Sequence, residues 1–197
     1  ALIGAAKALP QDGHPAFHLA DFIVLALHTG CRSGELLGLE WDRVDLRNNL
    51  IRLEGDHTKS GRGRSVPING DARAALLGRA RHRAEHCPDS PWVFVNSNPR
   101  WKGRRISSVK SAFSAACKRA NIEHCTPHTL RHTCASWMVM EGRSLMEVRD
   151  ILGHSTVKMT ERYAHLAPER LREAVSVLET GRTLAVPSST TRRLRYQ

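Results

Sequence analysis

The sequence predicts a mostly α-helical domain with a small antiparallel β-sheet, an α+β fold in which helices dominate. Three observations support this prediction. Apolar residues recur at helical spacing between recognisable helix caps over most of the chain. Residues 49–68 instead alternate apolar and polar side chains on both sides of a glycine-rich loop. With 197 residues, the chain is long enough to bury one substantial core.

The first helical pattern covers residues 15–28, and Gly30 marks its end because glycine readily adopts the left-handed conformation of a C-cap. A shorter helix follows, in which Glu35 stands three residues after Arg32. A pair with this spacing is by default a helix salt bridge worth only tenths of a kcal/mol. The glycine-flanked turn before Arg32 also favours contact with a ligand.

The sheet is expected near residues 49–68 and 92–95. Residues 49–54 and 66–68 form the two strands of a predicted hairpin, and the run PWVFV adds a short strand. The hairpin loop HTKSGRGRS is basic and carries Lys59. Such a loop suits backbone contact with phosphates, although a solvated turn is the default interpretation.

Two further amphipathic helices are predicted over residues 71–86 and 108–121. The loop between the predicted strand at residues 92–95 and the predicted helix at 108–121 is basic and contains Trp101. It is a candidate for gripping a nucleic-acid backbone and, equally, for a solubilising loop. Its basic residues are Arg100, Lys102, Arg104 and Arg105.

A helix is predicted to begin at Thr126, which can act as N-cap, with Pro127 in the first turn. His128 and Arg131 share one face of this helix near its start, where unpaired N–H groups and the helix dipole favour an anion. The opposite face carries the apolar residues Leu130, Cys134, Trp137 and Met138.

The next helix starts with a capping box, Ser144 and Glu147, and ends at Gly153, which places His154 on the turn just beyond it. A third short helix leads to Tyr163, which therefore lies near a helix end. Pro168 opens a last predicted helix. After Gly181 the composition changes to a basic tail rich in serine and threonine, with no core pattern.

The overall charge indicates the class of partner. A net charge of +11 and a pI near 10.2 favour a polyanion, with nucleic acid as the obvious candidate. The 5 cysteines form no CxxC pair and indicate reduced thiols in a cytoplasmic protein. The most apolar run is too short and too amphipathic to span a membrane, and the chain carries no signal peptide pattern.

The polar candidates together suit chemistry on a phosphodiester. Two guanidiniums can grip its non-bridging oxygens and stabilise a pentavalent transition state, so we expect neither metal nor cofactor. A tyrosine becomes a nucleophile when cations surround it and a base accepts its proton, and an ammonium group can protonate the departing oxygen. The candidates are Arg32, Glu35, Lys59, His128, Arg131, His154 and Tyr163.

Four segments of the chain, in order, resemble the tyrosine recombinases of the phage integrase family. They are TGCRSGELLGLEW, TKSGRGRSVPI, PHTLRHTCASWM and LGHSTVKMTERYAHL. These resemble the family's first arginine box, its β-hairpin lysine segment, its His-x-x-Arg box, and its second-histidine and tyrosine boxes. An ordered signature of this kind is far more specific than any single box.

The resemblance implies the fold of a tyrosine recombinase catalytic domain and a role for each residue. Tyr163 would attack the scissile phosphate and leave a 3′-phosphotyrosyl link. Arg32 and Arg131 would clamp the phosphate, and His154 would donate another hydrogen bond to it. Lys59 would be the general acid for the 5′ oxygen. His128 would assist proton transfer at the tyrosine, and Glu35 would orient the cations.

The resemblance also implies partners and a domain organisation. The substrate would be double-stranded DNA in a bacterial host, at the nucleoid, and the DNA-contacting residues would be Lys59, Arg62, Arg64, Arg100, Lys102, Arg104 and Arg105. Residues 1–180 would form the catalytic domain and 181–197 the tail, of which 184–197 would join neighbouring subunits in a tetramer on DNA. Accessory DNA-bending proteins are compatible with this scheme. Because the chain begins at Ala1, we expect the family's N-terminal core-binding domain to be missing.

Other interpretations remain open at the level of sequence. A type IB topoisomerase or a telomere resolvase shares the phosphotyrosyl chemistry, and a DNA-binding module without cleavage would explain the charge. A metal-dependent hydrolase could use His124, Cys125, His128 and His132, although no HExxH arrangement is present. In that case His132 is a ligand; otherwise it is expected to be a packed or hydrogen-bonding helix residue.

Overall fold

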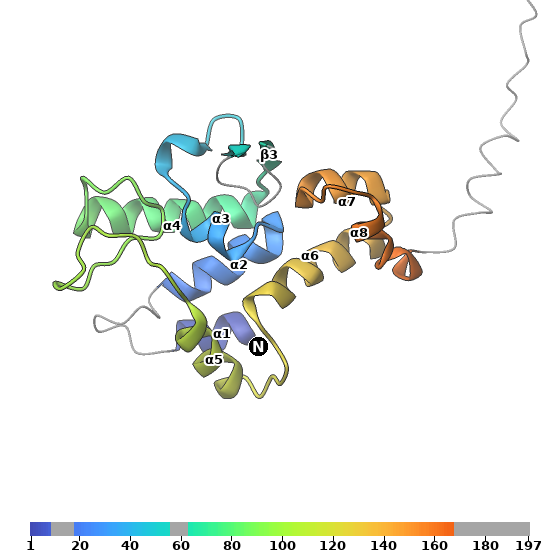
Figure 1. Cartoon of the computed structure of the whole chain (residues 1–197). Helices are drawn as coiled ribbons and strands as arrows, with labels where there is room; N and C mark the ends of the chain where they lie inside the picture. The colour runs from blue at the N-terminus through green and yellow to red at the C-terminus, as the bar shows by residue number, and fades with distance from the viewer. Residues whose placement is uncertain (9–17, 56–62, 168–197) are drawn as a thin grey trace, which may run out of the picture. The chain divides into compact units, whose positions relative to one another are not determined.

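The computed structural model describes residues 1–8, 18–55 and 63–167. These residues form a mainly helical fold with one three-stranded antiparallel sheet, as predicted (Figure 1). No helix in this part of the chain is both long and apolar enough to cross a membrane. The elements are α1 (Leu2–Lys7), α2 (Leu19–Thr29), α3 (Ser33–Leu37), η2 (Trp41–Arg43), β1 (Val44–Asp45), β2 (Leu50–Leu53), β3 (Arg64–Pro67), α4 (Gly70–His86), α5 (Lys110–Arg119), α6 (Pro127–Met140), α7 (Leu145–Leu152), α8 (Lys158–Glu161) and η4 (Ala164–Leu166).

Helix α2 is central to the core, because it packs against α1, α3, α4 and α6. Its side chains Phe22, Ile23 and Leu25 are fully buried. The helix begins at Leu19, later than predicted, and residues 15–17 lie outside the described part of the chain. It ends as predicted at Gly30, whose φ of +62° is left-handed.

Gly30 is also required by packing. A Cβ atom at this position would clash with Cδ2 of Leu152 on α7. The absence of a side chain therefore allows the end of α2 to approach α7 closely.

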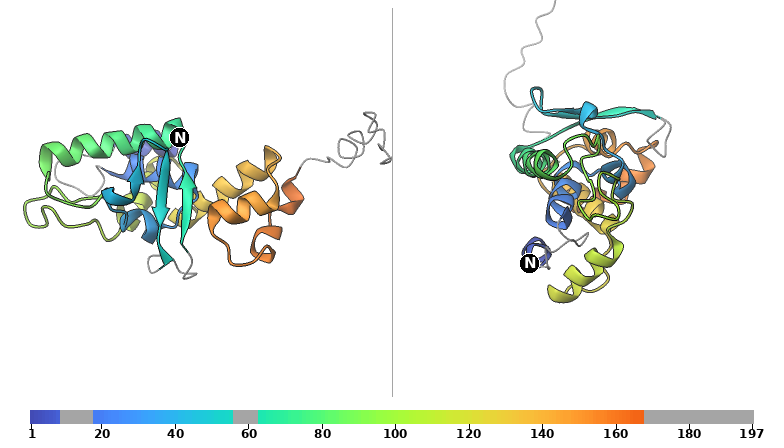
Figure 2. Two further views of the ribbon diagram at one scale, coloured as in Figure 1. Left: turned by 90° about the horizontal axis from the view of Figure 1, so that it is seen from above. Right: turned by 90° about the vertical axis from the view of Figure 1, so that its left-hand side faces the viewer.

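The sheet has the order β1, β2, β3, and the predicted hairpin is confirmed by the pairing of Ile51 with Val66. Ile51, Leu53 and Val66 are buried, whereas the side chains between them are exposed. Figure 2 shows the sheet edge-on in its right-hand view, with the helices on one side of it. Strand β1, which is only two residues long, was not predicted.

The predicted strand at residues 92–95 does not join the sheet. This segment makes only isolated bridges, between Glu40 and Trp92 and between Val95 and Arg105. Its apolar residues Val93 and Phe94 are buried in the core. The apolar run that suggested a strand is explained by this burial rather than by regular pairing.

A second, smaller core joins α6 to α7. Its buried members are Ala135, Val139, Val148, Leu152 and Tyr163. Leu130 and Cys134, on the predicted apolar face of α6, are buried as expected, but Trp137 of the same face is 47% exposed. Helix α6 therefore connects the two cores, and Tyr163 is packed into the smaller one. The predicted helix opened by Pro168 and the tail at 181–197 lie outside the described residues.

Candidate active site

Five of the six predicted catalytic residues line one cavity of about 530 Å³: Arg32, His128, Arg131, His154 and Tyr163. They come from the start of α3, from α6, from the turn after α7 and from the N-cap of η4, two residues after α8. The cavity is also lined by His132, Lys158 and Arg162, which were not among the predicted catalytic residues. The sixth predicted residue, Lys59, lies outside the described residues, as does Arg62.

One guanidinium nitrogen of Arg131 is hydrogen-bonded and another is left unpaired. The start of α6 is capped as predicted, with Thr126 as N-cap and Pro127 in the first turn. Arg131 is only 3% exposed, and its Nη1 donates a 2.7 Å hydrogen bond to the carbonyl oxygen of Gly30. Its Nη2 is buried without a hydrogen-bond partner among the described residues. Burial, followed by the nearby Arg32, lowers the pKa of Arg131 to about 10, so the group is still a cation at neutral pH.

A buried guanidinium with one unpaired N–H edge in a cavity is a strong indication of an anion site. Leaving a buried donor unsatisfied costs about 1–3 kcal/mol, and more for a charged group. An anionic oxygen placed beside Nη2 would remove this penalty.

Glu35 holds Arg32 through two contacts. The Glu35 carboxylate accepts hydrogen bonds from the Arg32 backbone N–H at 2.7 Å and from its Nη1 at 2.9 Å. The Glu35 side chain is only 2% exposed. Burial alone would raise the pKa of this carboxyl, but hydrogen bonds from Arg64 and Arg32 outweigh burial and hold the pKa below its usual value.

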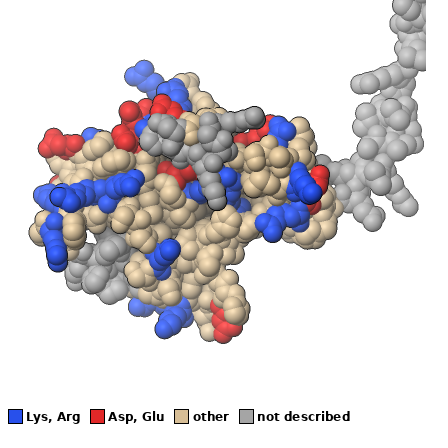
Figure 3. All heavy atoms as spheres, in the orientation of Figure 1, with Lys and Arg blue, Asp and Glu red and all other residues tan. Residues whose placement is uncertain are grey.

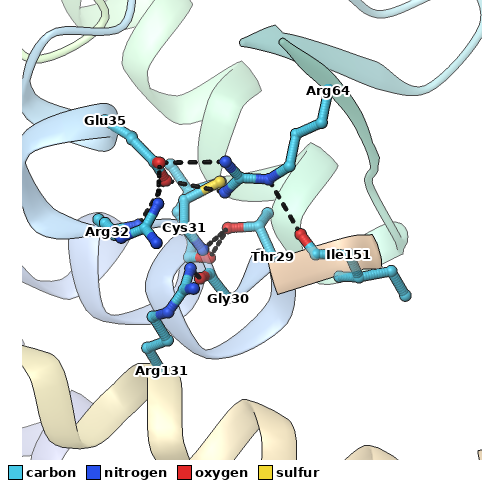
Figure 4. Close-up of polar contacts among 9 residues, drawn as sticks. Thr29, Gly30, Cys31, Arg32, Glu35, Arg64, Arg131 and Ile151 are labelled. Atoms are coloured by element: carbon cyan, nitrogen blue, oxygen red, sulfur yellow. Dashed lines mark hydrogen bonds and ion pairs between the residues drawn. The ribbon is translucent and has the colours of Figure 1, made fainter. Parts of the chain in front are cut away.

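Arg64 binds the other side of the same carboxylate, and its predicted contact with DNA stays a prediction. Its Nη1 and Nη2 donate to Glu35 at 3.0 and 2.8 Å, and its Nε donates to the Ile151 carbonyl oxygen at 3.1 Å. Figure 4 shows the Arg32 and Arg64 guanidiniums both turned toward Glu35. Arg64 is 9% exposed and ties the hairpin to α3 and to the end of α7. Loop composition could not predict these contacts, because their partners are far away in sequence.

We expect Arg64→Ala to lower the free energy of unfolding by about 3 kcal/mol, since it removes one partner of a buried ion pair. Arg64→Lys is the matched control. Lysine keeps the charge near Glu35 but lacks the planar fork that also reaches Ile151, so an intermediate loss is expected. Urea titration measures both. A reduced DNA affinity with an unchanged unfolding midpoint would contradict this structural role and support Arg64 as a DNA contact.

His154 is placed by the turn that ends α7. The capping box is confirmed, with Ser144 Oγ accepting from the Glu147 N–H at 3.2 Å, and Gly153 closes the helix with φ +67°. A Cβ at Gly153 would lie 2.8 Å from Arg64 Cδ, so glycine allows the turn to sit against that side chain. The His154 Nδ1 is 2.9 Å from the buried Thr160 Oγ1, which orients the ring in the cavity.

Burial, followed by Arg131 and Arg32, lowers the pKa of His154 to about 4. An unfolded histidine binds its proton near pH 6.5, so between pH 6.5 and 4 the unfolded chain holds more protons than the folded one. Stability is therefore expected to fall as the pH drops through this window. We expect a lower urea midpoint at pH 5 than at pH 7.5, and a smaller decrease in His154→Gln. Equal decreases of the urea midpoint in the unmutated chain and in His154→Gln would show that the lowered pKa of His154 is not the cause.

Tyr163 is 6% exposed and belongs to the smaller core. Burial raises its pKa, and this effect is opposed by Arg162 and Arg131, so the hydroxyl is protonated at neutral pH. The hydroxyl lies 2.5 Å from Nδ1 of His132. His128, to which the resemblance assigned the proton, instead packs edge-on against His132 with ring centroids 4.6 Å apart. The only sequence signal for His132 was its position one turn after His128 on the same helix face.

The basic loop residues Arg100, Lys102, Arg104 and Arg105 do not line this cavity. The guanidiniums of Arg100 and Arg104 lie 5.3 and 5.5 Å from the Trp101 ring centroid. Trp101 is 47% exposed. On the face drawn in Figure 3, Lys and Arg side chains occur in several separate groups with acidic side chains between them. Their predicted contact with DNA stays a prediction.

The residues considered for a metal site do not form one. Within residues 1–8, 18–55 and 63–167, no group of three or more His, Cys, Asp or Glu side chains is arranged to hold a metal ion. What the cavity offers is cationic N–H donors beside a phenol and neutral imidazoles. Such a set can bind a tetrahedral oxyanion and present a nucleophile to it.

Comparison with known proteins points to one family. Residues 3–170 match the model of the phage integrase family. The chain is 30% identical over 179 residues to the integrase of Salmonella phage P22, covering 86% of this chain and 45% of that protein. It is 33% identical over 160 residues to the tyrosine recombinase XerC of Corynebacterium glutamicum, covering 79% and 50%. The chain thus spans about half the length of these relatives.

The fold of this chain is also similar to a solved structure of an integrase catalytic domain. The catalytic domain of bacteriophage HP1 integrase superposes with a TM-score of 0.63 at 30% identity, covering 89% of this chain and 88% of that domain. The similarity therefore extends over nearly all of both chains in this comparison.

Proposed function

Because the chain belongs to the phage integrase family of tyrosine recombinases, we propose that it cuts and rejoins DNA through a covalent link to Tyr163. The observation that carries this proposal is the buried Arg131, which has an unpaired Nη2 and lines the same cavity as Tyr163. A scissile phosphate bound there would satisfy the guanidinium and meet the nucleophile at once.

In the proposed reaction Tyr163 Oη attacks the phosphorus, and the bond from phosphorus to the 5′ oxygen breaks. Arg32 and Arg131 hold the non-bridging oxygens, and His154 donates a further hydrogen bond to them. Lys59 gives a proton to the departing 5′ oxygen, and His128 assists proton transfer at the tyrosine. The 3′-phosphotyrosyl bond keeps the energy of the broken bond, so a 5′ hydroxyl can later reverse the step without a cofactor.

The proposed substrate is double-stranded DNA, and the proposed outcome is site-specific recombination. We place the catalytic domain at residues 1–180 and assign the tail at 184–197 to contact between subunits of a tetramer on DNA. The tail lies outside the described residues. The high net charge supports a polyanionic partner, because each phosphate neutralised releases counterions.

Supercoiled plasmid in EDTA tests this chemistry without knowledge of the target site. After a detergent quench we expect relaxed circles and strands that carry protein at the 3′ end, with the 5′ end open to labelling by a kinase. Relaxation that needs Mg²⁺ and leaves no protein on DNA would contradict the proposal and favour a metal-dependent nuclease. Plasmid that is bound but never cut would favour the binding module.

A further inference from the structure

The tyrosine hydroxyl already has a partner in the protein without DNA, and that partner has no role in the reaction described above. Tyr163 Oη and His132 Nδ1 are 2.5 Å apart, although the two residues are 31 positions apart in the chain. Their rings lie 5.9 Å apart, centroid to centroid, at an angle of 48°. The contact is therefore made by the packing of α6 against the segment after α8.

His132 is a neutral base in this state. Burial, followed by His128, Arg162 and Arg131, lowers its pKa below the usual histidine value. His154 is a further titratable neighbour, since His132 contributes to lowering its pKa. Neither set of neighbours includes a carboxylate. A neutral imidazole has one ring nitrogen with a free lone pair, and Nδ1 can use it to accept the phenol O–H.

Binding of a phosphodiester would make His132 easier to protonate. The cations that disfavour a positive imidazole, Arg131 and Arg162, line the same cavity as His132. An anion bound among them offsets their charge and makes protonation of the imidazole easier. The base is thus weak in the free protein and stronger once a substrate is in place.

We propose that His132, rather than His128, accepts the proton of Tyr163 during strand cleavage; this rests on the proposed function. As Tyr163 Oη forms its bond to phosphorus, the O–H bond breaks and the proton passes to His132 Nδ1, which becomes a cation. The P–O5′ bond breaks and its electron pair leaves on the 5′ oxygen, which Lys59 protonates. On rejoining, the 5′ hydroxyl gives its proton back to the Lys59 amine as its oxygen attacks the phosphorus, the phosphotyrosyl P–O bond breaks, and His132 returns its proton to the departing phenolate.

The arrangement on α6 gives the two histidines different roles. His128 is exposed and contacts His132 edge-on, whereas His132 is partly buried and contacts the nucleophile itself. His128 therefore acts on the tyrosine through His132 as a positioning residue.

A measurement without DNA tests the hydrogen bond. The pKa of His132 is followed by NMR in the unmutated chain and in Tyr163→Phe, with His132→Asn used to assign the signal. Loss of a donor to the neutral ring should raise the pKa of His132 by about 0.5 to 1, since a net hydrogen bond contributes about 1 kcal/mol. A pKa that does not change in Tyr163→Phe would overturn the proposal.

A second measurement tests the proton transfer. The rate of adduct formation on plasmid DNA is followed between pH 6 and 9 in the unmutated chain, His132→Asn and His128→Gln. Asparagine can keep a hydrogen bond near the Nδ1 position but cannot take the proton. We therefore expect the rate of adduct formation to fall by at least about 10²-fold in His132→Asn and to recover partly as the pH rises. His128→Gln should slow the reaction but keep the original dependence on pH. A large, pH-dependent loss in His128→Gln, with only a small loss and an unchanged pH dependence in His132→Asn, would overturn the proposal.

Rescue separates a missing base from a damaged fold. In His132→Ala, imidazole added to the buffer should restore adduct formation at least tenfold, and the same addition should do nothing in Tyr163→Phe. If the unmutated chain forms adducts while His132→Asn keeps its rate and pH profile, the inference fails and the proposed function stands. If the unmutated chain forms no adduct, the proposed function fails and this inference fails with it.

Discussion

Tyr163→Phe is expected to abolish covalent attachment to DNA while DNA binding is retained. Phenylalanine keeps the ring that is buried in the smaller core together with Val139 and Leu152, so the fold should survive. What is lost is the nucleophilic oxygen and its hydrogen bond to His132, which contributes about 1 kcal/mol. Adducts are measured on denaturing gels with labelled DNA, and binding by a mobility shift.

The matched control for this variant is Tyr196→Phe, because the chain contains only 2 tyrosines. Tyr196 lies in the tail outside the described residues and has no motif around it. Adducts should persist in Tyr196→Phe. Adducts that persist in Tyr163→Phe and disappear in Tyr196→Phe would show that the nucleophile has been assigned to the wrong residue.

Arg131→Ala is expected to slow strand cleavage by about 10²- to 10³-fold, the usual effect of removing one donor to a developing oxyanion. The affinity for DNA should fall only modestly, because one contact among many phosphate contacts is lost. Single-turnover adduct formation and binding at several salt concentrations separate the two effects. An unchanged cleavage rate would exclude Arg131 from the phosphate clamp.

Arg131→Lys sharpens this test. The guanidinium of Arg131 donates to the Gly30 carbonyl oxygen through Nη1 and leaves the buried Nη2 unpaired, an arrangement that a single ammonium group cannot reproduce. The lysine variant should therefore recover most of the affinity but not the cleavage rate. Because both changes affect a buried group, urea titration is needed to show that each variant is folded.

Local signals in the sequence were reliable because their causes lie within a few residues. The caps at Gly30 and Gly153 and the capping box of Ser144 with Glu147 depend on backbone groups up to four positions away. The pairing of Ile51 with Val66 follows from alternation on either side of one loop. The strand expected at residues 92–95 failed because an apolar run predicts burial but does not supply a partner strand.

The sequence by itself determined the helical fold, the order of the boxes and the set of residues considered for catalysis, since each is recorded in local pattern or spacing. Only the tertiary structure decided what these side chains contact. Arg64 binds Glu35 across 29 positions and Ile151 across 87, and His132 meets Tyr163 across 31. From the sequence, Arg64 was predicted only as a basic, DNA-contacting residue of the hairpin loop, and His132 only as a packed or hydrogen-bonding helix residue. Their roles come from burial and from neighbours that the chain brings together only when α3, α6, α7 and the hairpin pack.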